Sequence, residues 1–342
     1  MSAKKYTVAV VGAGKRGRLH AEIFSKSSRF QLAGLCDVDR ERLTAAAQLC
    51  GNPELYDDAS KMLNETKPDI FCFCTPPAIR LPLIKLGAEH NVKLIAYEKP
   101  MSTNYNEATE IMNICRQAGI KTVVSHQQKY GDHYRKVKEI IDSGALGRIH
   151  TVYGHVWGWY LHMATHVMDY IRYFNNDAEA EWVIGQVHGR GKLTDNHPSP
   201  DYAGGFIQFR NGVRGIVEIG ALSPDVPEVE YPWHKGRFGV QGTEGFAEML
   251  IGGGWRANTR DSNGPISGPG KFDAMHDQSL YIEDIALWLD GVKVHPCNGE
   301  SAYKGFELAM ALLRSAIERK LIALPLGPGE NEIEALKRII PE

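Results

Sequence analysis

The fold of this chain is decided by its first apolar stretch, Thr7-Val8-Ala9-Val10-Val11, and by the six residues that follow it, Gly12-Ala13-Gly14-Lys15-Arg16-Gly17. The apolar run is short, as expected of a buried strand, and a helical pattern begins near residue 16. The residues between them have the pattern G-x-G-x-x-G. A glycine-rich turn from a strand into a helix presents backbone N–H groups to phosphate. This stretch therefore predicts the opening of a dinucleotide-binding domain.

Short apolar runs and helical patterns continue to alternate up to about residue 125. The apolar runs cover residues 7–11, 32–36, 70–74, 94–97 and 121–124. The helical patterns lie near 16–26, 40–50, 58–64, 78–90 and 104–118. Continuous apolar runs are typical of strands buried on both faces of a parallel sheet with helical crossovers. We therefore expect residues 1–125 to form an NAD-binding Rossmann domain, a doubly wound parallel sheet of the α/β class.

Asp37 is the expected ribose-binding residue of this domain. It ends the second apolar run, 20 residues after Gly17, where an acidic side chain accepts hydrogen bonds from the adenosine ribose. A carboxylate there repels a 2′-phosphate, so NAD is favoured. Arg16 and Arg40 could shift to meet a phosphate, which leaves NADP as the alternative cofactor. The alternative without a cofactor is a glycine-rich turn beside a surface aspartate.

Glu98-Lys99-Pro100 follows the apolar run at 94–97 and supplies a candidate catalytic lysine. Ligands of such sheets bind beyond the carboxyl ends of the strands, which is where Lys99 lies. Partial burial lowers the pKa of a lysine toward a value useful for proton transfer. The alternative is an exposed loop lysine paired with Glu98.

The pattern changes after residue 126. A strand is predicted within 148–157, and two hairpins follow, one around Asn211-Gly212 and one around residues 242–245. Residues 252–270 are predicted to form a long glycine-rich loop, either a lid or a connector. Helical patterns lie near 276–290 and 300–319. Residues 126–342 are therefore expected to form a C-terminal α/β substrate-binding and oligomerisation domain. Its large, open, mainly antiparallel sheet would carry helices on one face and self-associate through the other.

The stretch from Trp157 to Asp169 holds an unusual set of polar and aromatic side chains. On a helix, His162, His166 and Asp169 would share one face, with Trp157 and Tyr160 close by in sequence. Catalytic acid–base histidines are the favoured interpretation. Histidines packed at a domain interface and a metal-binding histidine pair are the alternatives. The pair lacks the glutamate of H-E-x-x-H and a further ligand cluster, so we expect no metal.

Length, charge and cysteine content limit the class of protein. At 342 residues the chain is long enough for two domains. The 39 basic and 41 acidic residues give a net charge of -2, so no nucleic acid or anionic membrane is expected as a partner. No apolar run approaches the ~20 residues of a membrane span. Six cysteines without a C-x-x-C pair indicate reduced thiols and a cytoplasmic location.

The ordered set of motifs resembles the Gfo/Idh/MocA family, the relatives of glucose–fructose oxidoreductase and inositol dehydrogenase. The motifs that carry the resemblance are Gly12-Ala13-Gly14-Lys15-Arg16-Gly17, Asp37, Thr75-Pro76, Glu98-Lys99-Pro100, Ser143-Gly144-Ala145-Leu146-Gly147 and His166-Val167-Met168-Asp169. The match spans nearly the whole chain, and Glu98-Lys99-Pro100 together with the N-terminal pattern is its most specific part. The resemblance implies a nicotinamide-dependent oxidoreductase of a sugar, cyclitol or related polyol, as a homodimer or homotetramer.

The resemblance also implies roles for individual residues. Lys99 matches the family's catalytic lysine and His166 its catalytic histidine, with His162 as a further candidate. Implied cofactor contacts are Gly12, Ala13, Gly14, Lys15, Arg16, Gly17, Asp37, Thr75, Pro76, Arg80, Glu98 and Lys99. Implied substrate contacts are Lys99, Lys129, Trp157, Tyr160, His162, His166 and Asp169. The substrate carbinol is expected between Lys99 and His166.

Two positions depart from the family pattern. The family usually has an aspartate four residues before the catalytic histidine, and this chain has His162 there. The loop after the strand at 70–74 usually carries a histidine, and this chain has Arg80 there. An aspartate would orient His166 and raise its basicity, whereas a neutral His162 orients it weakly. The usual pair of side chains therefore does not transfer directly, and Lys99 is expected to carry more of the proton transfer.

Two other functions compete with net oxidation or reduction. Tightly held NAD could oxidise a sugar transiently, allow elimination of an aglycone and be restored in the same turnover, which is glycosidase chemistry. A chain with this fold could also sense a nucleotide without catalysis, although Lys99 and His166 count against that. The sequence leaves the particular sugar, the reaction direction and the number of subunits open.

Overall fold

The computed structural model describes residues 4–341, which divide into two compact units. The first unit contains the chain up to Ser102 together with Glu107–Gln127 and Ala274–Tyr303. The second contains Thr103–Asn106, Gln128–Asp273 and the chain from Lys304 onward. Both units are therefore built from segments that are not continuous in sequence.

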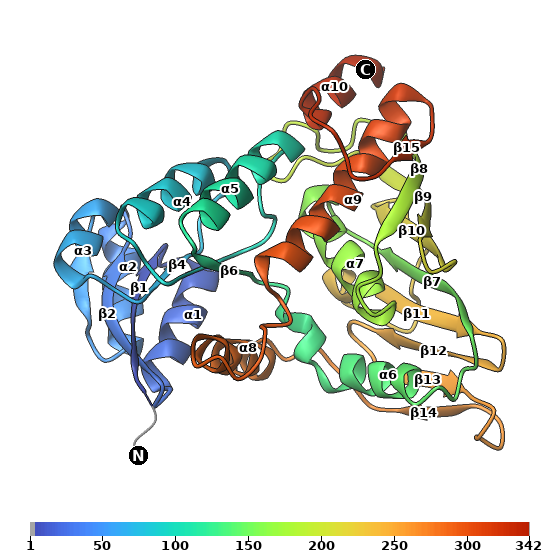
Figure 1. Cartoon of the computed structure of the whole chain (residues 1–342), viewed down its shortest axis with the longest axis horizontal. Coiled ribbons are helices and arrows are strands. Elements are labelled where there is room, and N and C mark those ends of the chain that lie inside the picture. The colour runs from blue at the N-terminus through green and yellow to red at the C-terminus, as the bar shows by residue number, and fades with distance from the viewer. Residues whose placement is uncertain (1–3, 342) are drawn as a thin grey trace. The chain divides into compact units, whose positions relative to one another are not determined.

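The first unit is built on a six-stranded, wholly parallel sheet with the order β3-β2-β1-β4-β5-β6. Figure 1 labels β1, β2, β4 and β6 of this sheet. Its strands are β1 (Tyr6–Val11), β2 (Phe30–Cys36), β3 (Glu54–Tyr56), β4 (Ile70–Phe73), β5 (Leu94–Tyr97) and β6 (Lys121–Val124). The connecting helices are α1 (Lys15–Lys26), α2 (Arg40–Leu49), α3 (Ala59–Thr66), η1 (Pro77–Ile79), α4 (Arg80–Glu89) and α5 (Tyr105–Gln117). β4 and β5 are buried at every residue, as expected for central strands covered on both faces. This strand order is that of a doubly wound dinucleotide-binding fold, and the predicted fold class is confirmed.

Helix α8 (Ala274–Leu289) also belongs to the first unit. Tyr6 on β1 donates a hydrogen bond of 2.8 Å to Asp290, which follows α8. A β-bridge joins Val123 to Asn298. The division expected at residue 125 therefore differs from the compact units in the segments 103–106 and 274–303. A break in composition near residue 126 carries no signal that the chain returns later to its first unit.

The second unit is built on a nine-stranded sheet with the order β14-β13-β12-β11-β7-β10-β9-β8-β15. Its strands are β7 (Ile149–Val156), β8 (Ala180–His188), β9 (Tyr202–Phe209), β10 (Arg214–Gly220), β11 (Gly236–Gly242), β12 (Gly245–Leu250), β13 (Trp255–Asn258), β14 (Ile266–Gly268) and β15 (Ile322–Ala323). All adjacent strands pair antiparallel except β7 with β10. The predicted open, mainly antiparallel sheet is therefore confirmed.

Helices cover one face of this sheet. The helices of this unit are η2 (Gln127–Tyr130), α6 (Asp132–Asp142), α7 (Tyr160–Phe174), η3 (Pro232–His234), α9 (Gly299–Glu318) and α10 (Glu332–Ile339). α7 packs on β7, β10 and β11, and α6 packs on β12 and β13 (Figure 1). Strand residues pointing toward the helices, among them Val152, Val217 and Phe238, are fully buried. The side chains that alternate with them are partly exposed on the other face, as in a sheet with one solvated side.

The prediction for residues 252–270 is wrong. This segment is not a loop, because it contains β13 and β14, which extend the edge of the second sheet. The prediction failed because six glycines and two prolines lie in that stretch, and such residues usually mark turns. Here the strands are only four and three residues long, too short to show an apolar alternation.

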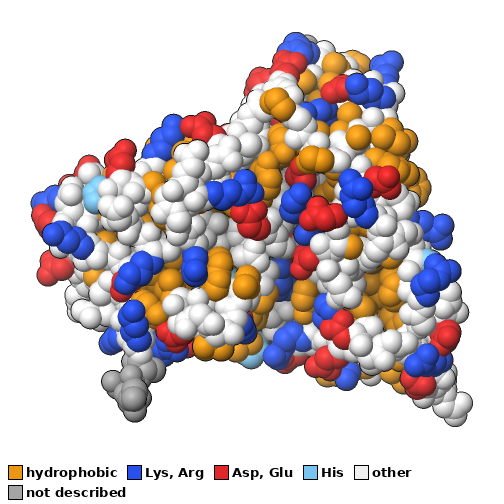
Figure 2. All heavy atoms as spheres, viewed as in Figure 1, with side chains coloured by type: hydrophobic (Ala, Val, Ile, Leu, Met, Phe, Trp, Pro, Cys, Tyr) orange, Lys and Arg blue, Asp and Glu red, His pale blue; other side chains and the backbone are white. Residues whose placement is uncertain are grey.

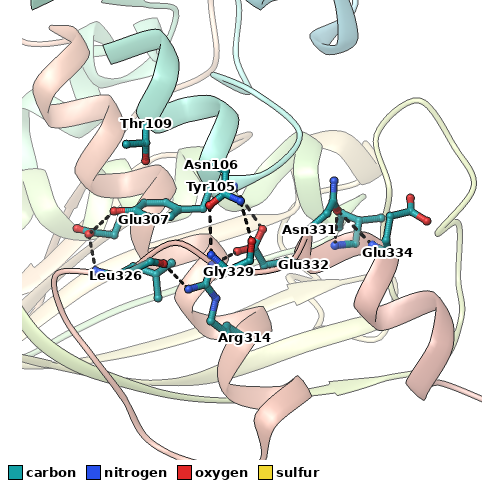
Figure 3. A network of polar contacts seen from close by, with 12 residues as sticks. Tyr105, Asn106, Thr109, Glu307, Arg314, Leu326, Gly329, Asn331, Glu332 and Glu334 are labelled. Carbon is teal, nitrogen blue, oxygen red and sulfur yellow. Dashed lines mark hydrogen bonds and ion pairs between the residues drawn. The ribbon is translucent and has the colours of Figure 1, made fainter. Parts of the chain in front are cut away.

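A buried polar network fixes the short segment Thr103–Asn106 to the second unit (Figure 3). The hydroxyl of Tyr105 donates to Glu307 on α9 at 3.1 Å, and its backbone N–H donates to Glu332. Glu332 also pairs with Arg314 at 2.5 Å. Both carboxylates are buried and each has more than one donor, which offsets the cost of removing them from water.

Over the described residues, no helix is long and apolar enough to cross a membrane. Basic and acidic side chains are interspersed on the face seen in Figure 2. This distribution agrees with the net charge of -2.

Candidate active site

The glycine-rich loop between β1 and α1 has the geometry of a phosphate cradle. Gly12 has a φ of +92°, and a Cβ there would lie 2.6 Å from the carbonyl oxygen of Cys74. A Cβ on Gly17 would lie 1.6 Å from the carbonyl oxygen of Gly12. Gly14, in contrast, faces open space, and no side chain caps the start of α1. Gly12 and Gly17 allow the close backbone approach in this turn, and the uncapped helix end keeps N–H groups for an anion.

Asp37 follows β2 and its side chain reaches the same loop. It is buried, and its Oδ2 accepts a hydrogen bond of 2.6 Å from the backbone N–H of Ala13. Its Oδ1 accepts from the N–H of Asp39 at 2.9 Å. The next residue, Val38, is 92% exposed, so an apolar surface adjoins the carboxylate. A carboxylate beside an apolar patch suits an adenosine with its ribose.

Arg80 and Thr75 bring unsatisfied buried polar atoms to the carboxyl end of β4. Arg80 is 1% exposed, and its Nη2 donates to the backbone oxygens of Thr75 and Lys99 at 3.1 Å each. Its Nε and Nη1, and the hydroxyl of Thr75, have no hydrogen-bond partner among the residues described. Buried donors without partners are costly. These atoms, together with the glycine-rich cradle and Asp37, fit a bound dinucleotide.

Lys99 lies next to a buried carboxylate at the end of β5. Glu98 accepts hydrogen bonds from Arg16 at 2.8 Å and pairs with His20 at 3.1 Å. Burial would raise the pKa of Glu98, but Arg16, His20 and Lys99 hold that pKa well below its usual range. Burial, against the opposing effect of Glu98 and together with the charges of Arg16 and Arg80, lowers the pKa of the Lys99 amine to about 7. Lys99 can therefore release or accept a proton near neutral pH.

His20, Cys72 and Cys74 form a cluster that the sequence did not reveal. Their ligand atoms lie within 4.8 Å of one another, and no other such group occurs in the part of the chain that the structure describes. A hydrogen bond with Cys72 and burial raise the pKa of the Cys74 thiol well above its usual value. Metal binding requires thiolates. Burial lowers the pKa of His20, but Cys74 and Glu98 raise it to about 9, so a protonated imidazole occupies this place. The protonated His20 therefore stabilises the Glu98 carboxylate. With a thiol at Cys74 and no lone pair at His20, the cluster does not fit a metal ion.

His166 lies on α7 in the second unit, where it is 4% exposed. Its Nδ1 lies 2.8 Å from the hydroxyl oxygen of Tyr170, one helical turn later. The Tyr170 hydroxyl donates in turn to Oε1 of Gln128 at 3.0 Å. The hydroxyl of Tyr134 on α6 donates to the same oxygen at 3.3 Å. His166 is thus linked through Tyr170 to a buried chain of hydrogen bonds.

Lys129 and Asp169 form a buried ion pair beside this chain. The distance from Nζ to Oδ2 is 2.8 Å, and the two side chains are 4% and 0% exposed. The Lys129 ammonium also lies over the ring of Tyr173. Both residues were predicted as substrate contacts. The structure pairs them with each other, and they join η2 to α7.

An aromatic cluster lies around the start of α7. Trp233 has edge-on contacts with Trp157, Trp159 and His162, at ring-centroid distances of 5.1, 5.2 and 5.2 Å. His162 also has an edge-on contact with His197 at 5.2 Å. All five side chains are partly exposed. Tyr160, by contrast, is fully buried, and its hydroxyl donates to the carbonyl oxygen of Ala309 at 2.7 Å, which anchors α7 to α9.

The predicted residues therefore form two groups, one in each unit. The first unit brings the glycine-rich loop, Asp37, Thr75, Arg80, Glu98 and Lys99 to the carboxyl edge of its sheet. The second unit brings Lys129, His166 and Asp169 together beside η2 and α7. Sequence reasoning missed His20 and Gln128, which are 78 and 42 residues away from their partners Glu98 and Tyr170. Tyr170, spaced four residues after His166, was visible as a helical neighbour but was not singled out.

The fold of the first unit, with the residues at the carboxyl edge of its sheet, defines an oxidoreductase with an NAD-binding Rossmann domain. Residues 6–126 match the family model described as "Oxidoreductase family, NAD-binding Rossmann fold", and residues 134–248 match the GFO/IDH/MocA C-terminal domain. The chain belongs to the GFO/IDH/MocA family of oxidoreductases. The resemblance on which the sequence predictions rested is therefore confirmed, as is NAD as the cofactor.

The relatives and solved structures to which the chain is similar include oxidoreductases and dehydrogenases. The chain is 24% identical to the uncharacterized oxidoreductase YrbE of Bacillus subtilis, with 91% of this chain and 94% of that protein covered. It is 23% identical to myo-inositol 2-dehydrogenase of Thermotoga maritima, with 62% and 67% covered. A structure of levoglucosan dehydrogenase in complex with NADH superposes with a TM-score of 0.81 at 17% identity, covering 95% of this chain and all of that one (100%). At this identity the structural likeness concerns the fold.

Proposed function

We propose that this protein is an NAD-dependent dehydrogenase or reductase that transfers a hydride between the cofactor and a hydroxyl or carbonyl group of a sugar, cyclitol or related polyol. The observation that carries the proposal is the Lys99 amine, which follows the central strand β5 of the NAD-binding sheet and has its pKa lowered to about 7. A proton must leave the hydroxyl while a hydride leaves its carbon. A group that titrates near neutral pH is suited to take that proton.

The residues that would hold the cofactor follow from the first unit. The N–H groups at the start of α1 would bind the pyrophosphate, and Asp37 would accept hydrogen bonds from the adenosine ribose. Exposed Val38, with Ile79 at 46% exposure, offers apolar surface to an adenine. The carboxylate of Asp37 supports NAD over NADP, because a 2′-phosphate would meet its negative charge. NAD supplies the nicotinamide carbon that accepts the hydride in oxidation or returns it in reduction.

Lys99 and His166 are the proposed proton-transfer groups. Near pH 7 about half of the Lys99 side chains are neutral amines, given a pKa of about 7, and the neutral form can accept the hydroxyl proton. The Glu98 carboxylate beside it stabilises the ammonium that results. His166 offers an imidazole that is held in place by Tyr170. In the reductive direction the same groups return a proton to the carbonyl oxygen.

The aromatic cluster at the start of α7 supports a ring-shaped polyol as substrate. Aromatic side chains pack against the apolar C–H face of a sugar, and Trp157, Trp159 and Trp233 are all partly exposed. His162 and His197 in the same cluster offer polar atoms for hydroxyl groups. The named relatives include dehydrogenases of inositol, apiose and glucosides, which are substrates of this chemical class.

A substrate screen tests the proposal. The purified protein is incubated with NAD and a panel of inositols, aldoses, glycosides and sugar acids, and the near-ultraviolet absorbance of the reduced nicotinamide is followed. At least one compound should give sustained accumulation of reduced cofactor that scales with protein. Release of an aglycone without reduced cofactor would instead identify a glycosidase. Binding of NAD without turnover of any panel member would count against the proposal.

We also propose that the open face of the nine-stranded sheet joins two copies of the chain. Phe206 on β9 is 51% exposed and Ile184 on β8 is 44% exposed. A depression of about 430 Å³ on this face is lined by Tyr153, Phe206 and Ile216, among others. Exposed apolar side chains on a broad sheet face favour association. Light scattering in solution should give at least twice the chain mass, and a monomeric mass would exclude the association.

A cytoplasmic location is a further part of the proposal. All six cysteines lie among the described residues and none of them forms a disulfide there, which agrees with a reducing compartment. Cell fractionation with an antibody to the protein tests this location.

A further inference from the structure

We propose that Tyr170 and Gln128 are positioning residues for His166, and that together they hold its neutral imidazole in the tautomer with the proton on Nδ1. In this arrangement Nε2 is the basic atom of His166. The inference rests on the proposed function only for the role of Nε2 in proton transfer, because the tautomer is argued from hydrogen bonds between residues of the second unit.

The direction of the hydrogen bonds follows from counting protons. The amide oxygen Oε1 of Gln128 has no proton, so the Tyr170 hydroxyl must donate to it across the 3.0 Å between them. A phenol has one proton, so toward His166 the same oxygen can only accept. The atom at 2.8 Å, Nδ1, must therefore carry the proton. In a neutral imidazole the other nitrogen then has the lone pair.

Packing keeps this chain of hydrogen bonds in place. Tyr170 is fully buried, and its ring has edge-on contacts with Tyr134 at 4.9 Å and Phe238 at 5.3 Å. Gln128 is 8% exposed and accepts a second hydrogen bond from Tyr134. With two hydroxyl donors directed at Oε1, a rotation of the amide that exchanged its oxygen and nitrogen would cost both bonds.

The contact between His166 and Tyr170 replaces the orienting contact that an aspartate at position 162 would make with His166. An aspartate one turn before His166 would accept from the imidazole and fix its tautomer, and this chain has His162 there. Tyr170 lies one turn after His166 on the same helix, and its hydroxyl oxygen accepts the hydrogen bond from Nδ1–H of His166 instead. A neutral phenol stabilises an imidazolium less than a carboxylate does. His166 should consequently accept a proton less readily here than beside a carboxylate, and the tautomer rather than the basicity is what the arrangement secures.

Two substitutions separate the roles of the partners. Gln128→Met removes the acceptor for Tyr170, so the hydroxyl becomes able to donate to Nδ1, and the proton of His166 moves to Nε2. Gln128→Glu keeps an acceptor at this place and should preserve the wild-type tautomer. Tyr134→Phe is the matched control, because it removes a hydroxyl from the same Gln128 oxygen and leaves the contact of Tyr170 with His166.

The tautomer is read directly by NMR of the imidazole nitrogens in protein labelled at histidine, with the His166 signals identified by their loss in His166→Gln. The wild type, Gln128→Glu and Tyr134→Phe should show the proton on Nδ1, and Gln128→Met should show it on Nε2. A wild-type proton on Nε2, or a Gln128→Met spectrum equal to the wild type, would overturn the inference. This readout needs no substrate, so it separates failure of the inference from failure of the proposed function.

Kinetics provide the second readout once a substrate is known. Gln128→Met should lower kcat by about tenfold or more with KM little changed, because the lone pair is moved and the binding surface is not. Gln128→Glu should recover most of that loss. Equal losses in both variants, with unaltered tautomers, would assign Gln128 to packing alone.

Discussion

The two units surround Lys99 and His166, the proposed proton-transfer groups, with different kinds of side chain. Around Lys99 the first unit gathers charges: Arg16, Arg80 and protonated His20 surround the single carboxylate of Glu98, and burial with the nearby cations lowers the pKa of Lys99 to about 7. In the second unit, by contrast, the hydrogen bonds of His166 run to the neutral side chains of Tyr170 and Gln128, and the adjoining residues Lys129 and Asp169 are paired with each other.

The comparison shows how the ordinary pKa of a group decides what the protein must do to it. A lysine titrates far above neutral pH, so only desolvation and like charge bring it into range. A histidine already titrates near neutrality and needs a defined tautomer instead. The excess of cations around Lys99 has a second consequence, since it suits a site that receives an anionic dinucleotide.

The largest effect is expected from breaking the ion pair in the second unit. Asp169→Asn leaves the Lys129 ammonium buried without its carboxylate, which typically costs about 3–5 kcal/mol. The free energy of unfolding, from urea denaturation, measures this loss. Asp142→Asn is the matched control, because Asp142 pairs with Lys138 on the exposed side of α6, and such pairs contribute about 0.5 kcal/mol or less. Equal effects of the two substitutions would contradict a buried, paired arrangement.

The next effect concerns Lys99, the proposed catalytic lysine. Lys99→Ala should lower kcat by ~10²-fold or more, equivalent to about 2.7 kcal/mol in the barrier, because it removes the amine proposed for proton transfer. Steady-state kinetics on a substrate found by the screen measure it. Lys93→Ala is the control, since Lys93 precedes β5 and pairs with Asp69 in an exposed position. Near-normal turnover of Lys99→Ala would remove this lysine from the mechanism.

A smaller effect tests whether charge sets the pKa of Lys99. Arg80 lowers that pKa, so Arg80→Gln, which keeps a donor and removes the charge, should raise it above about 7. The oxidation rate needs the neutral amine, so its rise with pH should move to more alkaline pH, with a several-fold lower rate at pH 7 and near-complete recovery at high pH. Arg80→Lys retains the charge and should keep the wild-type pH profile. A profile of Arg80→Gln that does not move would show that the charge of Arg80 does not contribute to the lowered pKa.

Much of the first unit was predictable because its signals are local. The run Thr7–Val11, the glycines after it and Asp37 follow one another in sequence, and the structure gathers them at one sheet edge. β3 was missed because a strand of three residues, Glu54–Tyr56, shows no apolar run.

The second unit was less predictable because its decisive contacts join distant residues. The hairpin around Asn211-Gly212 was identified from its turn, whereas β8, which begins at Ala180 far from its partner β9 in sequence, was not. Lys129 and Asp169 were each singled out, but only the structure pairs them across 40 residues. Gln128 carries no motif at all. Its importance arises from the direction in which two tyrosines donate, and no spacing rule encodes that direction.

The return of residues 274–303 to the first unit affects how the chain is synthesised. A ribosome releases the chain from its amino end, and the nucleotide-binding sheet is complete once residue 124 has emerged. Its outer layer is not, because α8 and the partners of Tyr6 and Val123 are still untranslated. During synthesis, the surface of the first unit that residues 274–303 cover therefore stays exposed until most of the second unit has been translated. A fragment that stops at residue 127 would keep that exposed flank permanently.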